Sequence, residues 1–251
     1  EKGVIPRRKS NKDCMIYNFA NGFVTNGHKV TVCASEEYRP LEPETNPFEV
    51  VYFKSRLPKL CKPYLIPYPV GLRKYVQENI AKYDLVIASE VFQMATLLIA
   101  DICKGKLVIW QELSLHNKMM FKLPSKIWYN CVVSCTSLKN ALVVARSENA
   151  KQFIKQYCRN VSDEIVEHGA NGELLKPKEH AGRNFSIVGQ LIARKNINAI
   201  IEKFAKFVKK DAYSDFVLNI IGEGKERENL EKLVGDLSIQ ENVKFRGFLT
   251  H

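Results

Sequence analysis

The C-terminal part of the chain alternates between short apolar runs and helical patterns. Residues 185–188, 216–221 and 243–245 are three mostly apolar runs, and a glycine follows each within two residues. Between the first two runs, apolar residues recur every three or four positions from Ile197 to Val208, which predicts an amphipathic helix with one buried face. A second helix is predicted over residues 230–237. The order strand, helix, strand, helix, strand predicts one half of a parallel α/β fold.

The N-terminal part repeats this alternation over a longer stretch. Runs that predict strands cover residues 28–32, 48–54, 83–89, 107–112 and 141–145, with a last strand and turn at 164–171; helical patterns cover residues 12–24, 71–82, 91–103 and 118–138. The polar stretch 176–183 is the natural linker between the two parts. The sequence therefore predicts two domains, residues 1–178 and residues 184–251.

Five short motifs stand in a fixed order in the C-terminal part. They are Gly189-Gln190-Leu191, Lys195 before a helix, Gly222-Glu223-Gly224, the second helix, and Val-Lys-Phe-Arg-Gly at residues 243–247. This order resembles the donor-binding half of the glycogen-synthase-like (family 4) retaining glycosyltransferases. A nicotinamide cofactor is not expected, because Arg227 stands where a dinucleotide-binding motif has its last glycine.

The resemblance implies a GT-B fold, in which two Rossmann-like α/β domains face each other across a cleft. It implies a metal-independent glycosyltransferase that moves a sugar from a nucleotide-sugar donor to a glycan or lipid-linked acceptor with retention, and that needs no cofactor. The family's first strand and glycine-rich loop are not found before residue 12, and its Glu-x7-Glu motif would follow His251. We therefore expect both ends of the family's fold to be missing and the polypeptide to be inactive alone. The alternative is a non-catalytic GT-B relative or fragment that binds nucleotide or glycan.

The same resemblance assigns the donor-binding residues. Lys195 matches the family's phosphate lysine, and its alternative interpretation is a solvated surface lysine. The family's second phosphate cation is an arginine, but Gln190 occupies that position here, so Arg194 is a candidate substitute. Charge compensation of a leaving diphosphate requires cations or N–H dipoles when no metal is present. The expected donor-binding set is Gly189, Gln190, Arg194, Lys195, Gly222, Gly224 and Phe248.

Two residues are candidates for catalysis in the N-terminal half. Glu112 ends the strand 107–112 and would orient the acceptor hydroxyl or stabilise a developing oxocarbenium ion. His116 is the alternative, because family members often carry a histidine near the end of this strand. The glycines 222 and 224 would let the backbone approach the donor, or would only shape a turn.

Composition narrows the partners and the compartment. The formal charge of +11 fits nucleic acid, an anionic membrane surface or phosphorylated substrates, but no RNA-recognition or helix-turn-helix signature is present, which makes nucleic acid the poorest of the three. The seven cysteines are odd in number and lack C-x-x-C spacing, which predicts reduced thiols and no metal site. We expect a cytoplasmic protein. The Met- and aromatic-rich segment 119–129 is either core or a docking surface for a lipid-linked acceptor or a membrane, which would make the protein peripheral.

Overall fold

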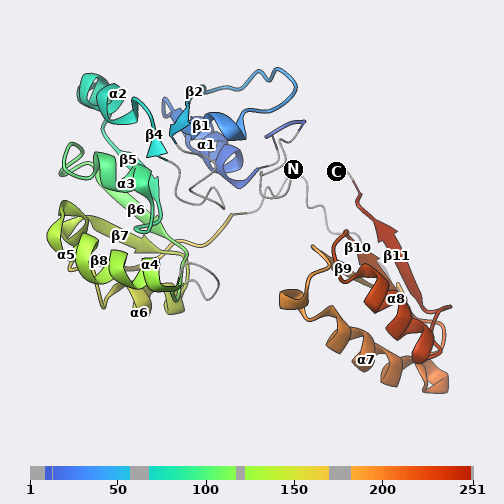
Figure 1. The fold of residues 1–251 in the computed structure, drawn as a ribbon. Helices are drawn as coiled ribbons and strands as arrows, with labels where there is room; N and C mark the ends of the chain where they lie inside the picture. The colour runs from blue at the N-terminus through green and yellow to red at the C-terminus, as the bar shows by residue number, and fades with distance from the viewer. Residues whose placement is uncertain (1–8, 13, 57–67, 117–121, 170–181, 250–251) are drawn as a thin grey trace. The chain divides into compact units, whose positions relative to one another are not determined.

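The computed structural model describes residues 9–12, 14–56, 68–116, 122–169 and 182–249. The chain divides into two compact units, residues 1–175 and residues 176–251, and each is described by itself (Figure 1). Most of the predicted linker, residues 176–183, lies outside the described residues. The predicted cleft between two halves stays a prediction.

A four-stranded parallel sheet forms the centre of unit 1. Its strands are β5 (Val86–Ser89), β6 (Leu107–Gln111), β7 (Leu142–Ala145) and β8 (Val161–Ile165), and they lie side by side in chain order. Helices α3 (Met94–Ile99) and α6 (Glu148–Ile154) connect strands of this sheet. Because all four strands are parallel, their carboxyl ends meet at one edge.

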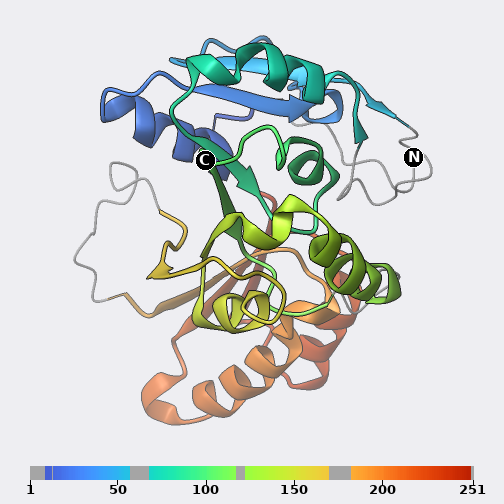
Figure 2. The ribbon, with the colours of Figure 1, turned by 90° about the vertical axis from the view of Figure 1, so that its left-hand side faces the viewer.

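A second parallel sheet of unit 1 holds two strands, β1 (Thr31–Ser35) and β2 (Glu49–Phe53), and follows helix α1 (Met15–Thr25). These elements lie beside helix α2 (Leu72–Asn79) at the top of Figure 2. The short strands β3 (Ser55–Arg56) and β4 (Tyr68–Pro69) pair in antiparallel. A hydrogen bond of 3.0 Å from the Tyr83 hydroxyl to Thr31 Oγ1 links this part to the segment before β5.

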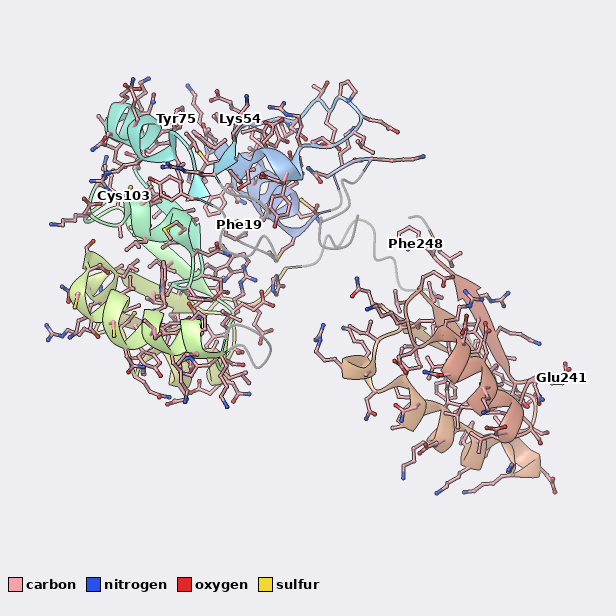
Figure 3. The ribbon with its side chains drawn as sticks, viewed as in Figure 1. Phe19, Lys54, Tyr75, Cys103, Glu241 and Phe248 are labelled. Atoms are coloured by element: carbon pink, nitrogen blue, oxygen red, sulfur yellow. The ribbon has the colours of Figure 1, made fainter. Side chains whose placement is uncertain are left out.

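One continuous helical segment packs against the larger sheet. It consists of α4 (Lys122–Ile127), the π-helical η3 (Trp128–Val132) and α5 (Val133–Cys135). Tyr129 and Val133 are fully buried in one core with Ile109 and Val143 of the sheet. Cys103 is also buried in this core (Figure 3). The predicted helix 118–138 is therefore present with a π turn inside it, and its start lies outside the described residues.

Several predicted boundaries in unit 1 are wrong; the last strand, predicted within 164–171, is β8 at Val161–Ile165, and β5 and α1 begin three residues later than predicted. The predicted helix 91–103 is shortened to α3 (Met94–Ile99). Val91 does not join a helical turn, because its backbone bonds to side chains: its N–H donates to Gln111 Oε1 at 3.0 Å and its C=O accepts from Trp128 Nε1 at 3.0 Å. Strand 28–32 lies three residues later, as β1, because its pairing with β2 runs from Thr31 to Ser35.

Unit 2 is a three-stranded parallel sheet with two helices. Strands β9 (Asn184–Val188), β10 (Val217–Ile221) and β11 (Val243–Gly247) pair in the order β11-β10-β9, and α7 (Ile197–Val208) and α8 (Arg227–Asp236) connect them. Most of the predicted apolar face of α7 is buried, with Ile201 fully enclosed in a core that includes Leu218 and Ile220, whereas Ile200 is exposed. The five predicted elements of this half are all confirmed.

The fold class is α/β with parallel sheets, as predicted. Five of the described cysteines are free thiols: Cys33, Cys103, Cys131, Cys135 and Cys158. Across the described ranges, no helix has both the length and the apolar character needed to cross a membrane.

Candidate functional site

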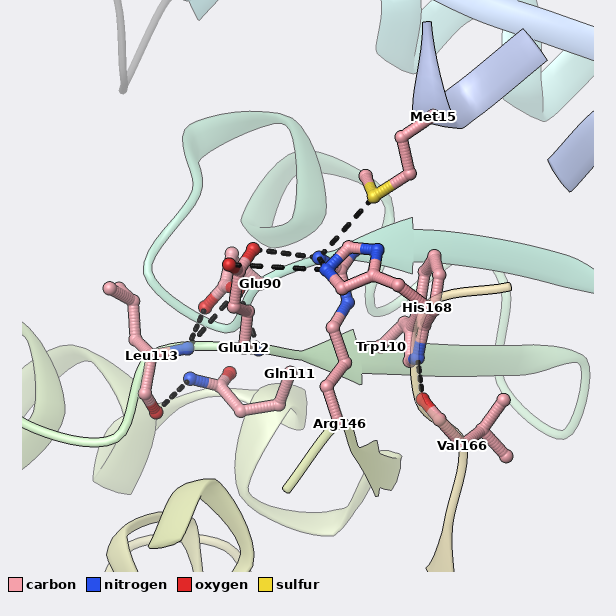
Figure 4. Close-up of polar contacts among 9 residues, drawn as sticks. All are labelled: Met15, Glu90, Trp110, Gln111, Glu112, Leu113, Arg146, Val166 and His168. Carbon is pink, nitrogen blue, oxygen red and sulfur yellow. Dashed lines mark hydrogen bonds and ion pairs between the residues drawn. The ribbon is translucent and has the colours of Figure 1, made fainter. Parts of the chain in front are cut away.

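A polar cluster occupies the carboxyl edge of the larger sheet in unit 1. Glu90 directly follows β5, Glu112 follows β6, Arg146 follows β7 and His168 lies three residues after β8. Figure 4 shows these side chains converging from four parallel strands. In open parallel sheets this edge is where ligands bind, because the loops that leave the strands there can present side chains without disturbing the core.

Arg146 is the centre of this cluster. Its Nη1 donates to Glu112 Oε2 at 2.7 Å and lies 3.0 Å from His168 Nε2, and the guanidinium stacks 3.7 Å above the centroid of the Trp110 ring. Burial lowers the pKa of Arg146, while the charges of Glu112 and Glu90 oppose that shift. Its Nε and Nη2 are buried without a hydrogen-bond partner among the described residues.

Trp110 forms the floor under Arg146. Its ring stacks on Phe19 of α1 with a centroid distance of 4.6 Å, and its Nε1 donates to the backbone oxygen of Val166 at 2.7 Å. The indole is therefore fixed on one face by an apolar ring and at its edge by a hydrogen bond. Its other face holds the guanidinium by a cation–π contact.

Glu90 is the second carboxylate of the cluster. It has a left-handed backbone, with φ of 67°, and is largely buried. Its Oε1 accepts from the backbone N–H of Glu112 at 2.7 Å and of Leu113 at 3.3 Å. Burial raises the pKa of Glu90 to about 7, and the charge of Glu112 adds to this, against the lowering effects of the two N–H donors and of Arg146.

His116 has other polar partners than Glu112. Its Nδ1 lies 3.1 Å from Ser125 Oγ and its Nε2 lies 3.1 Å from the Tyr157 hydroxyl. Its ring also packs edge to face against Phe153. Desolvation, followed by the charges of Lys126 and Lys122, lowers the pKa of His116. These contacts are those of a packed, neutral histidine, and its predicted catalytic role stays a prediction.

In unit 2, two glycine loops pack directly on each other at the carboxyl edge of the sheet. Gly189 N donates to Ile221 O at 2.9 Å, and Leu191 N donates to Glu223 O at 3.0 Å. A Cβ atom at Gly222 would lie 2.0 Å from Gly189 O, and one at Gly224 would lie 2.2 Å from Leu191 O. Loop packing alone therefore requires glycine at 222 and 224, and a donor that approaches this backbone remains a prediction.

The basic pair lies beside this loop. Arg194 and Lys195 end a 3₁₀ turn just before α7, and Asn196 between turn and helix is left-handed, with φ of 52°. A Cβ atom at Gly189 would lie 3.9 Å from Lys195 Cε, so the lysine side chain reaches back to the end of β9. Both cations are exposed, and neither has an ion-pair partner in the described part of the chain.

The remaining predicted donor-binding residues are exposed on the same edge. Gln190 projects from the loop after β9. Phe248 follows Gly247 at the end of β11 and is 77% exposed (Figure 3). The structure thus brings Gly189, Gln190, Lys195, Gly222 and Gly224 together on one edge, as the strand order required.

Residues 183–251 match the family Glycosyl transferases group 1. A glycosyltransferase of Haemophilus influenzae, described as uncharacterized, is 24% identical over 240 residues; the match covers 91% of this chain and 62% of that relative. The chain thus spans less than two thirds of the curated relative.

Solved structures of glycosyltransferases share the fold. HepE of Anabaena, solved in complex with UDP and also with UDP and glucose, has a TM-score of 0.59 for the UDP complex at 15% identity, covering 97% of this chain and 68% of HepE. A glycosyltransferase from Rickettsia africae has a TM-score of 0.60 at 15% identity, covering 94% of this chain and 64% of that one. At this identity the likeness establishes the fold, which matches GT-B glycosyltransferases.

Sequence reasoning missed Glu90, Trp110, Arg146 and His168 as members of one site. The available signal was positional, because each polar member lies within three residues of the end of a strand in the same parallel sheet.

The carboxyl edges of the two sheets differ in their chemistry. The edge in unit 1 offers carboxylates around a buried cation, which suits hydroxyl groups, and the edge in unit 2 offers free cations and backbone, which suits phosphates. Among the described residues, no three or more His, Cys, Asp or Glu side chains are grouped so that they could hold a metal ion.

Proposed function

We propose that the protein is a retaining, metal-independent glycosyltransferase that moves a sugar from a nucleotide-sugar donor to a glycan or lipid-linked acceptor. The observation that carries the proposal is the placement of Lys195 in the segment that matches the Glycosyl transferases group 1 family. Its ammonium group has no ion-pair partner among the described residues, and its side chain lies beside Gly189, at the end of strand β9. A diphosphate bound there would receive a full positive charge where its own negative charge develops.

Lys195 and Arg194 would supply the positive charge at the donor edge. Gln190 can donate hydrogen bonds but supplies no charge, so Arg194 is the second cation in this proposal. Phe248, exposed after β11, would contact the nucleobase. The bound UDP of HepE supports a uridine nucleotide as the first donor class to test.

Glu112 would act at the acceptor. Its carboxylate is exposed at the carboxyl edge of unit 1, and its ion pair with Arg146 holds it in one orientation. An ionised carboxylate there would orient an acceptor hydroxyl or stabilise a developing oxocarbenium ion. Replacing Glu112 with Gln should lower turnover by about two orders of magnitude, and replacing His116 with Phe should preserve it, because the ring is a packing partner.

The experiment that tests the proposal is a donor screen on the protein at its full natural length. UDP-glucose and other nucleotide sugars are incubated with the protein, with and without EDTA, and free nucleoside diphosphate is measured. We expect release from at least one donor, unaffected by EDTA and lost in a Lys195→Ala variant. NMR of the product anomer tests retention.

A second candidate function is a GT-B relative that binds nucleotide or glycan without turnover. Gln190 favours it, because the neutral amide leaves one phosphate cation fewer than the family pattern. Saturable UDP binding without release of nucleotide from any donor would support this candidate.

An anionic membrane surface is the proposed location of a lipid-linked acceptor. Leu123 and Ile127 are 68% and 52% exposed on α4, one helical turn apart, and Lys122 and Lys126 flank them. Such a face suits a cytoplasmic protein that binds peripherally to anionic lipid. Co-sedimentation with phosphatidylglycerol vesicles should exceed that with phosphatidylcholine vesicles and should fall in a Leu123→Asp, Ile127→Asp variant.

A further inference from the structure

Strand β6 extends beyond its neighbour β5. The last paired residues of the two strands are Ser89 and Trp110, yet β6 runs one residue further, to Gln111, and Glu112 and Leu113 follow it. No strand residue of β5 remains to accept the N–H groups of Glu112 and Leu113. The Glu90 carboxylate fills this place, with Oε1 at 2.7 Å from Glu112 N and at 3.3 Å from Leu113 N (Figure 4).

The backbone of Glu90 is itself held from both sides. Its N–H donates to Trp110 O at 3.1 Å, and its C=O accepts from Thr96 Oγ1 at 2.9 Å. A left-handed conformation is uncommon for a residue with a long side chain and persists where the surroundings determine it. Here the left-handed residue places its carboxylate beside the backbone that follows β6.

We propose that Glu90 is a positioning residue for Glu112: its buried carboxylate fixes the backbone after β6, so that the Glu112 side chain meets Arg146 and faces outward. This inference rests on the proposed function, in which Glu112 acts at the acceptor. Glu90 itself is largely buried and touches the backbone of residues 112 and 113, so its effect on the reaction passes through Glu112.

The charged and titratable groups that face Glu90 make this positioning depend on pH. Glu112 follows β6, Arg146 follows β7, and Tyr129 lies in the π-helical turn. Because the pKa of Glu90 is about 7, its charge changes near neutral pH. The ionised carboxylate binds the two N–H groups more strongly than the neutral acid does, and it also competes with Glu112 for the charge of Arg146.

An NMR titration tests the inference without any substrate. The backbone ¹H and ¹⁵N shifts of Glu112 and Leu113 are followed from about pH 5.5 to pH 8.5, a range centred on the pKa of the buried carboxyl group. Three proteins are compared: wild type, Glu90→Gln, and Glu167→Gln as a control at an exposed glutamate near the same edge. Gln keeps an acceptor oxygen and removes the charge.

The expected result is a shared titration of both amides with a midpoint near pH 7 in the wild type and in Glu167→Gln, and flat shifts in Glu90→Gln. Amides that do not titrate in the wild type, or that still titrate in Glu90→Gln, would overturn the proposal.

Kinetics provide the second readout. With a donor found in the screen above, Glu90→Ala should lower kcat about tenfold or more while the KM for the donor stays unchanged, because Glu90 acts through Glu112 and all the proposed donor-binding residues belong to unit 2. Glu90→Gln should recover most of kcat and flatten its pH profile near neutrality. Equal losses in both variants, or an unchanged kcat in Glu90→Ala, would contradict positioning. If the wild type turns over no donor, the proposed function fails, and the amide titration still decides the role of Glu90.

Discussion

The side chain of Arg146 is 3% exposed, whereas the side chain of its ion-pair partner Glu112 is 62% exposed. One charge of the pair is thus buried against the Trp110 ring, and the other reaches solvent 2.7 Å away. A buried cation needs a partner, and an exposed carboxylate does not. The pair therefore restrains Glu112 from below while leaving its outer surface open.

This asymmetry predicts unequal costs of mutation. Arg146→Ala should lower the free energy of unfolding by roughly 2–4 kcal/mol, because it removes the cation–π contact with Trp110 and the packing of the buried aliphatic part of the arginine side chain. Glu112→Ala should cost about 1 kcal/mol, since solvent screens its exposed carboxylate. Urea denaturation followed by tryptophan fluorescence measures both, because the two tryptophans, Trp110 and Trp128, lie in unit 1. Equal costs for the two variants would contradict this account of the pair.

Glu90 predicts a pH dependence of stability. Its pKa rises from 4.5 to about 7 on folding, so between these values the unfolded chain has lost a proton that the folded protein keeps. Stability must therefore fall as pH rises through this window, by roughly 3 kcal/mol in total. The Glu90→Gln variant lacks this term, so its stability relative to wild type should increase from pH 5 to pH 8. A difference that stays constant over this range in urea titrations would show that Glu90 titrates normally.

The sequence predicted unit 2 better than the site in unit 1, for physical reasons. The period of α7 and the run before Gly189 are local patterns, and parallel strands bring their ends together once the elements are known. A serine just before a helix is a local signal of the same kind, and Ser147 caps α6, where its Oγ accepts from Ala150 N at 3.2 Å.

Arg146, next to Ser147 in the chain, could not be assigned in the same way. Its burial depends on Trp110, which lies 36 positions earlier in the sequence, and on Phe19 beneath that ring. The position of the Glu90 carboxylate depends on a left-handed backbone conformation that no local sequence motif predicts. Such contacts are tertiary, and hydrophobic periodicity carries no information about them.

The glycine loops of unit 2 predict a sharp contrast between two alanine substitutions. Gly222→Ala should destabilise unit 2 by about 2 kcal/mol or more, because its φ of 133° and the 2.0 Å approach to Gly189 O leave no room for a methyl group. Gly235→Ala is the matched control in α8, where the nearest atom lies 3.9 Å away, and it should stabilise the helix by up to about 1 kcal/mol. Circular dichroism at 222 nm during thermal unfolding would compare the two. A neutral Gly222→Ala would mean that the loops can separate.

The central claim is that the edge around Lys195 binds the diphosphate of a nucleotide. Isothermal titration of UDP into the wild-type protein at full natural length, into Lys195→Ala, and into Lys203→Ala tests it most directly. Lys203 is an exposed lysine of α7 that lies one to two turns further along the helix. The account predicts that UDP binds the wild type and Lys203→Ala equally and binds Lys195→Ala about tenfold or more weakly, the loss expected for one charge-assisted contact. Equal affinity for Lys195→Ala and wild type would contradict it.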